Sequence, residues 1–212
     1  MPSYVSSADD LVLHGPRVLG FASPSRVATR FGLDADFVAE RLLDYEARGW
    51  VRHSAFDSSS GWSLTDSGRT ENERRLRLEL DEARARDRVA AAHATFVPLN
   101  RRLSTACTNW QIRPTRTDPM ELNDHTDWAW DETVLKTLAH LGGALSQLCD
   151  TLTQCLQRFD GYADRFSSAL ANVDAGQRRW VDSPEVDSCH TVWVQFHEDL
   201  LATLGIPRGA DA

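Results

Sequence analysis

Apolar residues return every three or four positions in three short segments near the N-terminus, and this is the period of an amphipathic helix. We expect the first helix to end at Gly15–Pro16, with an apolar continuation behind it. The second helix has Ser23 as its cap, a proline in its first turn and Gly32 as its stop. The third runs from the cap Asp34 to Gly49. The N-terminal region is therefore predicted to hold three helices.

The pattern then changes to two short stretches rich in β-branched and aromatic residues, WVRHSAF and WSLTD, on either side of the polar run DSSSG. Such stretches around a polar turn are typical of a β-hairpin. A hairpin that follows three helices predicts a winged helix-turn-helix, in which the hairpin is the wing.

The segment after Gly68 is rich in arginine, glutamate, alanine and leucine, which favour helix, and it lacks glycine and proline until Pro98. Val89, Phe96 and Leu103 recur every seven residues, so this helix should bury one seam. Proline removes a helical hydrogen bond, and we therefore expect a kink or a new segment at Pro98.

A loop with two prolines and several aspartates covers residues 109–127. Leucines in steps of three and four then predict a long helix from about Trp128 to Phe159. Gly142–Gly143 inside it indicates a kink or the close approach of another backbone. Two further amphipathic helices follow, so the second half is predicted to be a helical bundle.

The predicted fold is mainly α-helical, with an N-terminal winged helix-turn-helix and its small β wing joined by a long helix to a C-terminal helical bundle. We expect three parts: the winged helix-turn-helix domain in 1–68, a connecting and dimerisation helix in 69–106, and the bundle in 107–212. The bundle would bind a ligand, dimerise, or do both.

Charge is unevenly shared along the chain. The net charge is −8, of which residues 1–92 carry −2 and residues 93–212 carry −6. A strongly acidic second half argues against its contact with nucleic acid. With no apolar run long enough to span a membrane and no signal peptide at the start, we expect a cytoplasmic protein. The four cysteines lack metal-ligand spacing and are predicted to be buried free thiols.

The N-terminal third resembles a known class of regulators. Apolar and small residues fall at the spacing with which winged-helix regulators end the recognition helix and enter the first wing strand: Val38, Leu42, Tyr45, Gly49 and Trp50. The run GWSLTDSGR resembles the second wing strand and following turn of the MarR superfamily, where a similar motif precedes a long helix. The resemblance implies a winged-helix fold and binding to double-stranded DNA, although that family places a further dimerisation helix before the module.

The helix in the position of a recognition helix is acidic. Its outward positions hold Asp36, Glu40 and Asp44 among apolar residues, whereas major-groove readers usually present arginine, lysine or amides. Phosphate contacts must then come from positive residues mostly around it, and the predicted DNA-binding set is Arg17, Arg26, Arg30, Arg41, Arg52, His53 and Arg69. The alternative is a winged helix that does not bind DNA and partners an enzyme or another regulator.

Five of the seven tryptophans follow residue 100, and aromatic residues with a few polar groups typically build pockets for apolar or aromatic ligands. Trp128 and Trp130 stand two apart at a helix start and cannot both face one core, so one should line a cleft, an interface or solvent. The predicted ligand-binding set is Trp110, Trp128, Trp130, Trp193, His190 and His197.

Catalytic and metal signatures are absent from the sequence. It holds no phosphate-binding loop, no dinucleotide fingerprint, no serine-hydrolase motif and no helical pair of metal-binding histidines, so we expect no enzyme, no metal site and no cofactor. The sequence thus favours a homodimeric transcriptional regulator, in which a small-molecule effector shifts the spacing of two DNA-binding modules.

Overall fold

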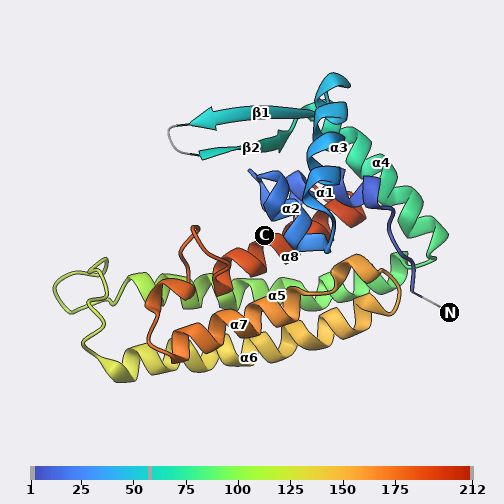
Figure 1. Cartoon of the computed structure of the whole chain (residues 1–212). Helices are drawn as coiled ribbons and strands as arrows, with labels where there is room; N and C mark the ends of the chain where they lie inside the picture. The colour runs from blue at the N-terminus through green and yellow to red at the C-terminus, as the bar shows by residue number, and fades with distance from the viewer. Residues whose placement is uncertain (1–2, 57–58, 211–212) are drawn as a thin grey trace. The chain divides into compact units, whose positions relative to one another are not determined.

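The computed structural model describes residues 3–56 and 59–210, which are mainly helical with a two-stranded antiparallel sheet after the first three helices (Figure 1). The chain forms two compact units. Unit 1 comprises Met1–Ala90, Leu152–Phe159 and Gln195–Asp211, and unit 2 comprises Ala91–Thr151 and Asp160–Val194. This division differs from the expected boundaries at residues 68 and 106, because the chain returns to unit 1 twice.

Helix α1 (Ala8–Leu19) continues through Gly15–Pro16, so the expected stop at these residues is wrong. Gly15 is a contact residue: a Cβ at this position would lie 2.6 Å from Cγ1 of Val27, which packs from α2. The helix ends instead at Gly20, whose φ of 77° only glycine adopts readily. Gly15 therefore allows α1 and α2 to approach closely.

Helices α2 (Pro24–Phe31) and α3 (Ala35–Ala47) have the predicted caps. The side chains of Ser23 and Asp34 each accept a hydrogen bond from a backbone N–H of the first turn. The left-handed conformation of Gly32, with φ 65°, ends α2 as expected.

Strands β1 (Val51–Phe56) and β2 (Ser59–Leu64) form the predicted hairpin and pair in a register that sets Val51 opposite Leu64. The predicted polar tip falls partly on residues 57–58, which lie outside the described residues. Ala22, between α1 and α2, adds an isolated bridge to Trp62 on β2. The bridge joins β2 of the hairpin to the segment between α1 and α2.

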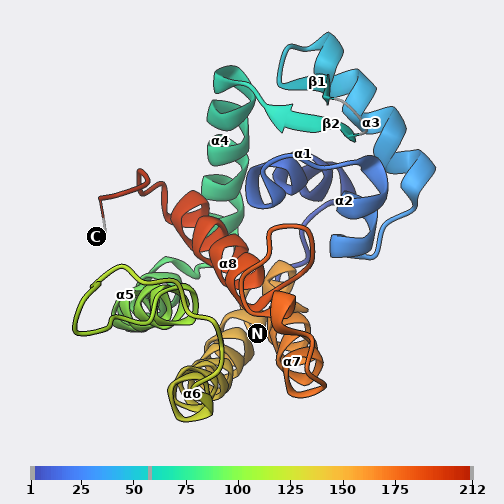
Figure 2. The same cartoon turned by 90° about the vertical axis from the view of Figure 1, so that its left-hand side faces the viewer.

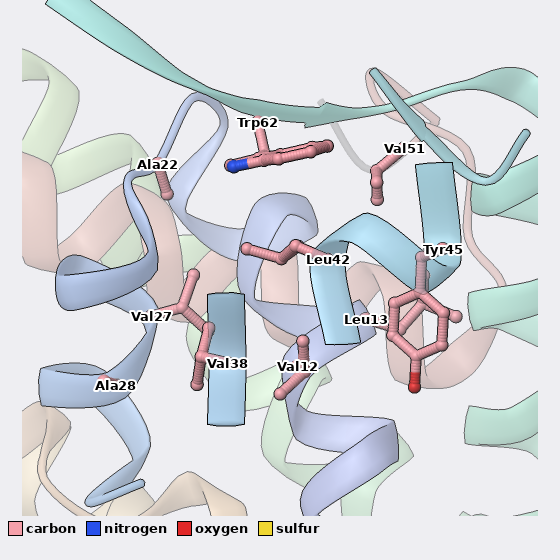
Figure 3. Close-up of a cluster of buried hydrophobic side chains, with 10 residues drawn as sticks. All are labelled: Val12, Leu13, Ala22, Val27, Ala28, Val38, Leu42, Tyr45, Val51 and Trp62. Atoms are coloured by element: carbon pink, nitrogen blue, oxygen red, sulfur yellow. The ribbon is translucent and has the colours of Figure 1, made fainter. Parts of the chain in front are cut away.

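A single apolar cluster holds these elements together (Figure 3). Each of α1, α2, α3, β1 and β2 contributes to it, through Val12, Leu13, Ala22, Val27, Ala28, Val38, Leu42, Tyr45, Val51 and Trp62. The buried residues of α3 are the ones that its helical period predicts, so its outward positions are also as expected.

The expected single helix after the hairpin is two helices, α4 (Asp66–Glu82) and α5 (Arg86–Gln111). The break lies at Arg84, which takes a positive φ of 49°, and Pro98 lies inside α5 without ending it. The predicted seam of α5 is confirmed, since Val89, Phe96 and Leu103 are all buried.

Unit 2 is built from most of α5, from α6 (Trp128–Thr153), from α7 (Tyr162–Asp174) and from the start of α8 (Cys189–Leu204). Helices α5, α6 and α7 lie side by side, and Figure 2 shows them nearly end-on. A Cβ on Gly142 would lie 3.1 Å from the ring of Phe166, so a side chain of α7, rather than the expected backbone, packs against this glycine.

Helix α6 ends earlier than the leucine pattern predicts, at Thr153, and a short 3-10 turn, η1 (Gln157–Phe159), replaces its last part. A second such turn, η2 (Arg178–Trp180), precedes α8. All four cysteines are buried free thiols, as expected. No helix among the residues that the structure describes has the length and apolar character needed to cross a membrane.

Candidate functional site

The exposed face of α3 is acidic, as its sequence predicts. Asp36, Glu40 and Asp44 are exposed there together with Leu43, whose surface is 58% accessible. The positive residue of this helix, Arg41, pairs with Asp44 at 2.7 Å. A carboxylate on a base-reading surface can accept a hydrogen bond only from a base amino group, and it repels phosphate. The face therefore carries little that binds DNA directly.

Arg17 does not face solvent. Its side chain is buried between Glu198 of α8, which accepts a hydrogen bond from Nε, and Glu73 of α4, which lies 3.0 Å from Nη1. Arg69 is more exposed, but its Nη1 also lies within 3.9 Å of Glu198. The predicted DNA contact by Arg17 is thus a misassignment, because its charge is used inside unit 1.

Arg30 is directed at the same region of unit 1. Its Nη2 donates to the backbone carbonyl of Arg158 at 3.0 Å. The Arg158 guanidinium is itself buried and donates to Glu79 at 2.9 Å and to Asp199. Burial opposes ionisation of Asp199, but the charges of Arg158, His14 and Arg30 hold its pKa well below the ordinary value.

These contacts form a buried ion-pair network of two clusters, His14–Asp199–Arg158–Glu79 and Arg17–Glu198. It joins α1 and α4 to the two later segments of unit 1. Removing one member of such a network leaves an uncompensated buried charge, which is far more costly than losing a surface pair. The network is therefore structural, and it includes Arg17, which the sequence had suggested as a DNA-binding residue.

Arg26 and His53 lie on different elements of the helix–hairpin region, α2 and β1. The exposed Arg26 donates to the carbonyl of Phe21, the residue before the bridge partner of Trp62. His53 packs on the indole with ring centroids 4.9 Å apart.

Arg52 is the neighbour of His53 on β1, and successive strand side chains point to opposite faces. It lines a shallow groove of about 450 Å³ with Ser63, Thr65, Asp66 and Ser67 at the start of α4. Arg48, which the prediction omitted, is exposed at the end of α3 and stacks on Trp50 at 5.1 Å.

The seven predicted DNA-binding residues consequently do not share one surface. Arg17, Arg30 and Arg69 approach the buried network, and Arg41 is paired on α3. The exposed arginines of the helix–hairpin region that form no ion pair with the described residues are Arg26, Arg48 and Arg52.

The predicted aromatic ligand site is dispersed in unit 2. Trp193 is a core residue that stacks on Phe96 at 4.9 Å and donates from its indole to Asn100. Trp110 is also buried, whereas Trp128 is 67% exposed, which confirms that one residue of the Trp128–Trp130 pair lies outside the core.

The remaining members of that set lie in different places. Trp130 donates from its indole to the carbonyl of Asn109 at 2.7 Å. His190 is half-buried at the start of α8, and His197 belongs to unit 1 rather than unit 2. A groove in unit 2 is lined by other residues of α5 and α6.

Unit 2 does contain a histidine–aspartate pair that the sequence did not reveal. Nδ1 of His125 lies 2.9 Å from the buried Asp131, whose other oxygen accepts from Asn123 at 2.8 Å. The ring of His125 packs on Trp110 with centroids 4.4 Å apart, and its backbone φ is 60°. The cluster fastens the loop before α6 to the end of α5.

A shallow groove between α5 and α6 is the other feature that the sequence analysis missed. It is lined by Arg101, Arg102, Thr105, Asn109, Thr133 and Thr137. The polar pairs stand four residues apart on each helix, and this spacing is the signal that could have indicated it.

Two of the buried cysteines have raised pKa values. Burial raises the pKa values of Cys107 and Cys189 to about 12, so both thiols are poor nucleophiles. In the described part of the chain, no group of three or more histidine, cysteine, aspartate or glutamate side chains is placed to hold a metal ion.

Comparisons of the chain with protein-family models, with curated proteins and with solved structures find no match.

Proposed function

We propose that this chain is a DNA-binding regulator of the winged-helix class, which acts as a homodimer and senses a small molecule through unit 2. The observation that carries the proposal is the order of elements in unit 1: three closely packed helices, α1 to α3, followed directly by the β1–β2 hairpin. In winged-helix regulators this order presents a helix and a hairpin to the duplex.

The contacts in this proposal are made to phosphates and to groove shape, because α3 exposes carboxylates. Arg26, Arg48 and Arg52 are the cations available at the helix–hairpin region. Phosphate contacts position a protein on DNA but read no sequence. We therefore expect modest affinity and weak discrimination between sequences, unless the shape of the duplex supplies it.

Binding of a fluorescein-labelled duplex, taken from the DNA upstream of the protein's own gene, tests the proposal by anisotropy. Arg26→Ala on α2 and Arg52→Ala on β1 probe two of the proposed phosphate contacts separately, and Arg116→Ala in the exposed loop of unit 2 is the matched control. Loss of one phosphate contact reduces the magnitude of the salt slope by about 1. The proposal fails if the wild-type protein does not bind DNA at low salt. It also fails if neither Arg26→Ala nor Arg52→Ala differs from the Arg116→Ala control in DNA binding.

Dimerisation through unit 2 is supported by apolar surface near the loop that precedes α6. Met120, Leu122 and Trp128 are exposed there by 66%, 78% and 67%. Large apolar side chains grouped on a surface commonly mark an interface. Sedimentation of wild-type protein and of Leu122→Asp tests this part: we expect a dimer that the variant dissociates, and a monomeric wild type would remove it.

The acidic face of α3 favours a second candidate, a module that docks a positively charged protein partner. Glu40→Gln separates the two candidates, with Glu185→Gln, an exposed residue of unit 2, as the control for charge. If α3 approaches a duplex, removing Glu40 relieves repulsion and strengthens DNA binding. Equal DNA affinity for both variants would favour the docking candidate.

A further inference from the structure

We propose that unit 2 binds a small organic anion, with a carboxylate or phosphate head group, in the groove between α5 and α6. This names a different ligand class from the apolar or aromatic one that the tryptophans suggested. The regulatory meaning of the site rests on the proposed function, whereas binding itself does not.

The groove supplies a positive charge that no carboxylate neutralises. Arg101 and Arg102 line it, and the guanidinium group of neither forms an ion pair or hydrogen bond with any residue that the structure describes; Arg101 is bonded to Thr105 only through its backbone carbonyl. Two other arginines of unit 2 are paired: Arg113 with Asp127 at 2.7 Å and Arg165 with Asp187 at 2.9 Å. No aspartate or glutamate is among the residues that line the groove. Arginine forks match the oxygens of carboxylate and phosphate, so this place suits an anion.

Threonines on both helices of the groove supply hydrogen-bond acceptors. Thr133 and Thr137 donate their hydroxyl protons to carbonyls of their own helix at 2.9 Å. Thr105 does the same on α5 at 3.0 Å. Each of these hydroxyl oxygens keeps a lone pair that can accept a hydrogen bond from a ligand. A ligand that carries a hydroxyl or amino group beside its anionic head fits this arrangement.

The size of the groove limits the ligand. Its volume is about 310 Å³, and its floor includes the buried side chains of Ala106 and Val134. Since one water molecule occupies about 30 Å³ in the liquid, the groove has the volume of roughly ten waters and suits a small ligand. Hydroxycarboxylates and small sugar phosphates have this size, whereas nucleotides and fatty acids exceed it.

Isothermal titration calorimetry of the full chain with four probes tests the site: malate, 3-phosphoglycerate, inorganic phosphate and neutral erythritol. We expect malate or 3-phosphoglycerate to bind and erythritol not to bind. Preference between the first two distinguishes a carboxylate from a phosphate head group. Inorganic phosphate, if it binds, should do so more weakly, since it lacks the body that fills the groove.

Variants of the groove complete the test. Arg101→Gln and Arg102→Gln should each weaken binding about 10- to 100-fold, because each removes a charge-assisted hydrogen bond. Arg116→Gln, an exposed arginine of the same unit outside the groove, should leave binding unchanged. Both groove arginines are exposed, so circular dichroism should show unaltered folding.

The proposal is overturned if no anion binds the wild-type protein, or if binding survives both groove substitutions. Adding the bound anion to the DNA-binding assay then separates the two proposals. Anion binding without any DNA affinity would leave the ligand site standing and remove the regulator, and DNA binding without anion binding would do the reverse.

Discussion

Asp199→Asn is the substitution that most sharply tests the buried network of unit 1. Asp199 is fully buried, contacts the Arg158 guanidinium, and lies 3.1 Å from Nε2 of His14. Thr203 adds a neutral member, because its hydroxyl accepts a hydrogen bond from Arg158 at 2.6 Å. The substitution keeps the shape of the side chain but leaves the Arg158 charge without one of its two carboxylates.

Breaking a buried ion pair by removal of one partner costs about 3–5 kcal/mol, a large share of the stability of an ordinary domain. Urea denaturation at pH 7, followed by circular dichroism, measures this loss. Glu185→Gln removes an exposed charge of the same sign and should change the free energy of unfolding by less than about 0.5 kcal/mol. If Asp199→Asn does not fold, Thr203→Val is the milder probe and should cost about 1–2 kcal/mol.

The pH dependence has a defined sign. The folded-state pKa of Asp199 lies below the ordinary value of 3.8, so its contribution is complete above about pH 4 and is lost as the pH falls through the folded-state pKa. Wild-type protein should therefore lose stability relative to Asp199→Asn as the pH falls below 4. If Asp199→Asn is as stable as Glu185→Gln and loses stability in acid as the wild type does, the proposed network is refuted.

Three further predictions concern local features. Gly15→Ala should destabilise the protein by about 1–3 kcal/mol through its clash with Val27, and chemical denaturation of the Gly15→Ala/Val27→Ala cycle should show coupling; additive effects would contradict the close contact. Asp34→Ala should cost about 1 kcal/mol through loss of the α3 cap, which thermal denaturation would detect, and an unchanged melting temperature would count against it. Cys107 and Cys189 should resist a thiol reagent at pH 8 in the native protein and react once it is denatured, because burial raises their pKa values to about 12; rapid native labelling would oppose this.

Local signals in the sequence predicted the first elements well, since caps and stops act within a few residues. Ser23 and Asp34 cap the N-termini of α2 and α3, and Gly32 ends α2, as their residue types favour. The misplaced boundaries have a physical cause. Gly15 marks a contact between helices rather than a stop, and the break at Arg84 uses a residue type that seldom adopts positive φ.

The candidate sites were less accessible to sequence reasoning, because they depend on residues distant along the chain. Arg17 donates a hydrogen bond to the carboxylate of Glu198, which is 181 positions away along the chain. No local pattern reports such a pairing, and the sequence therefore offered Arg17 as a free cation. The groove in unit 2 similarly needs α5 and α6 to be aligned before its two polar stripes face one another.

The most direct test of the proposed function is the salt dependence of DNA binding by the wild-type protein. Three phosphate contacts predict that the logarithm of the association constant falls against the logarithm of the salt concentration with a slope of about −3. The affinity for the labelled duplex should then drop roughly 40-fold between about 50 and 200 mM salt. Absence of binding at about 50 mM salt, or an affinity that does not respond to salt, would contradict the account.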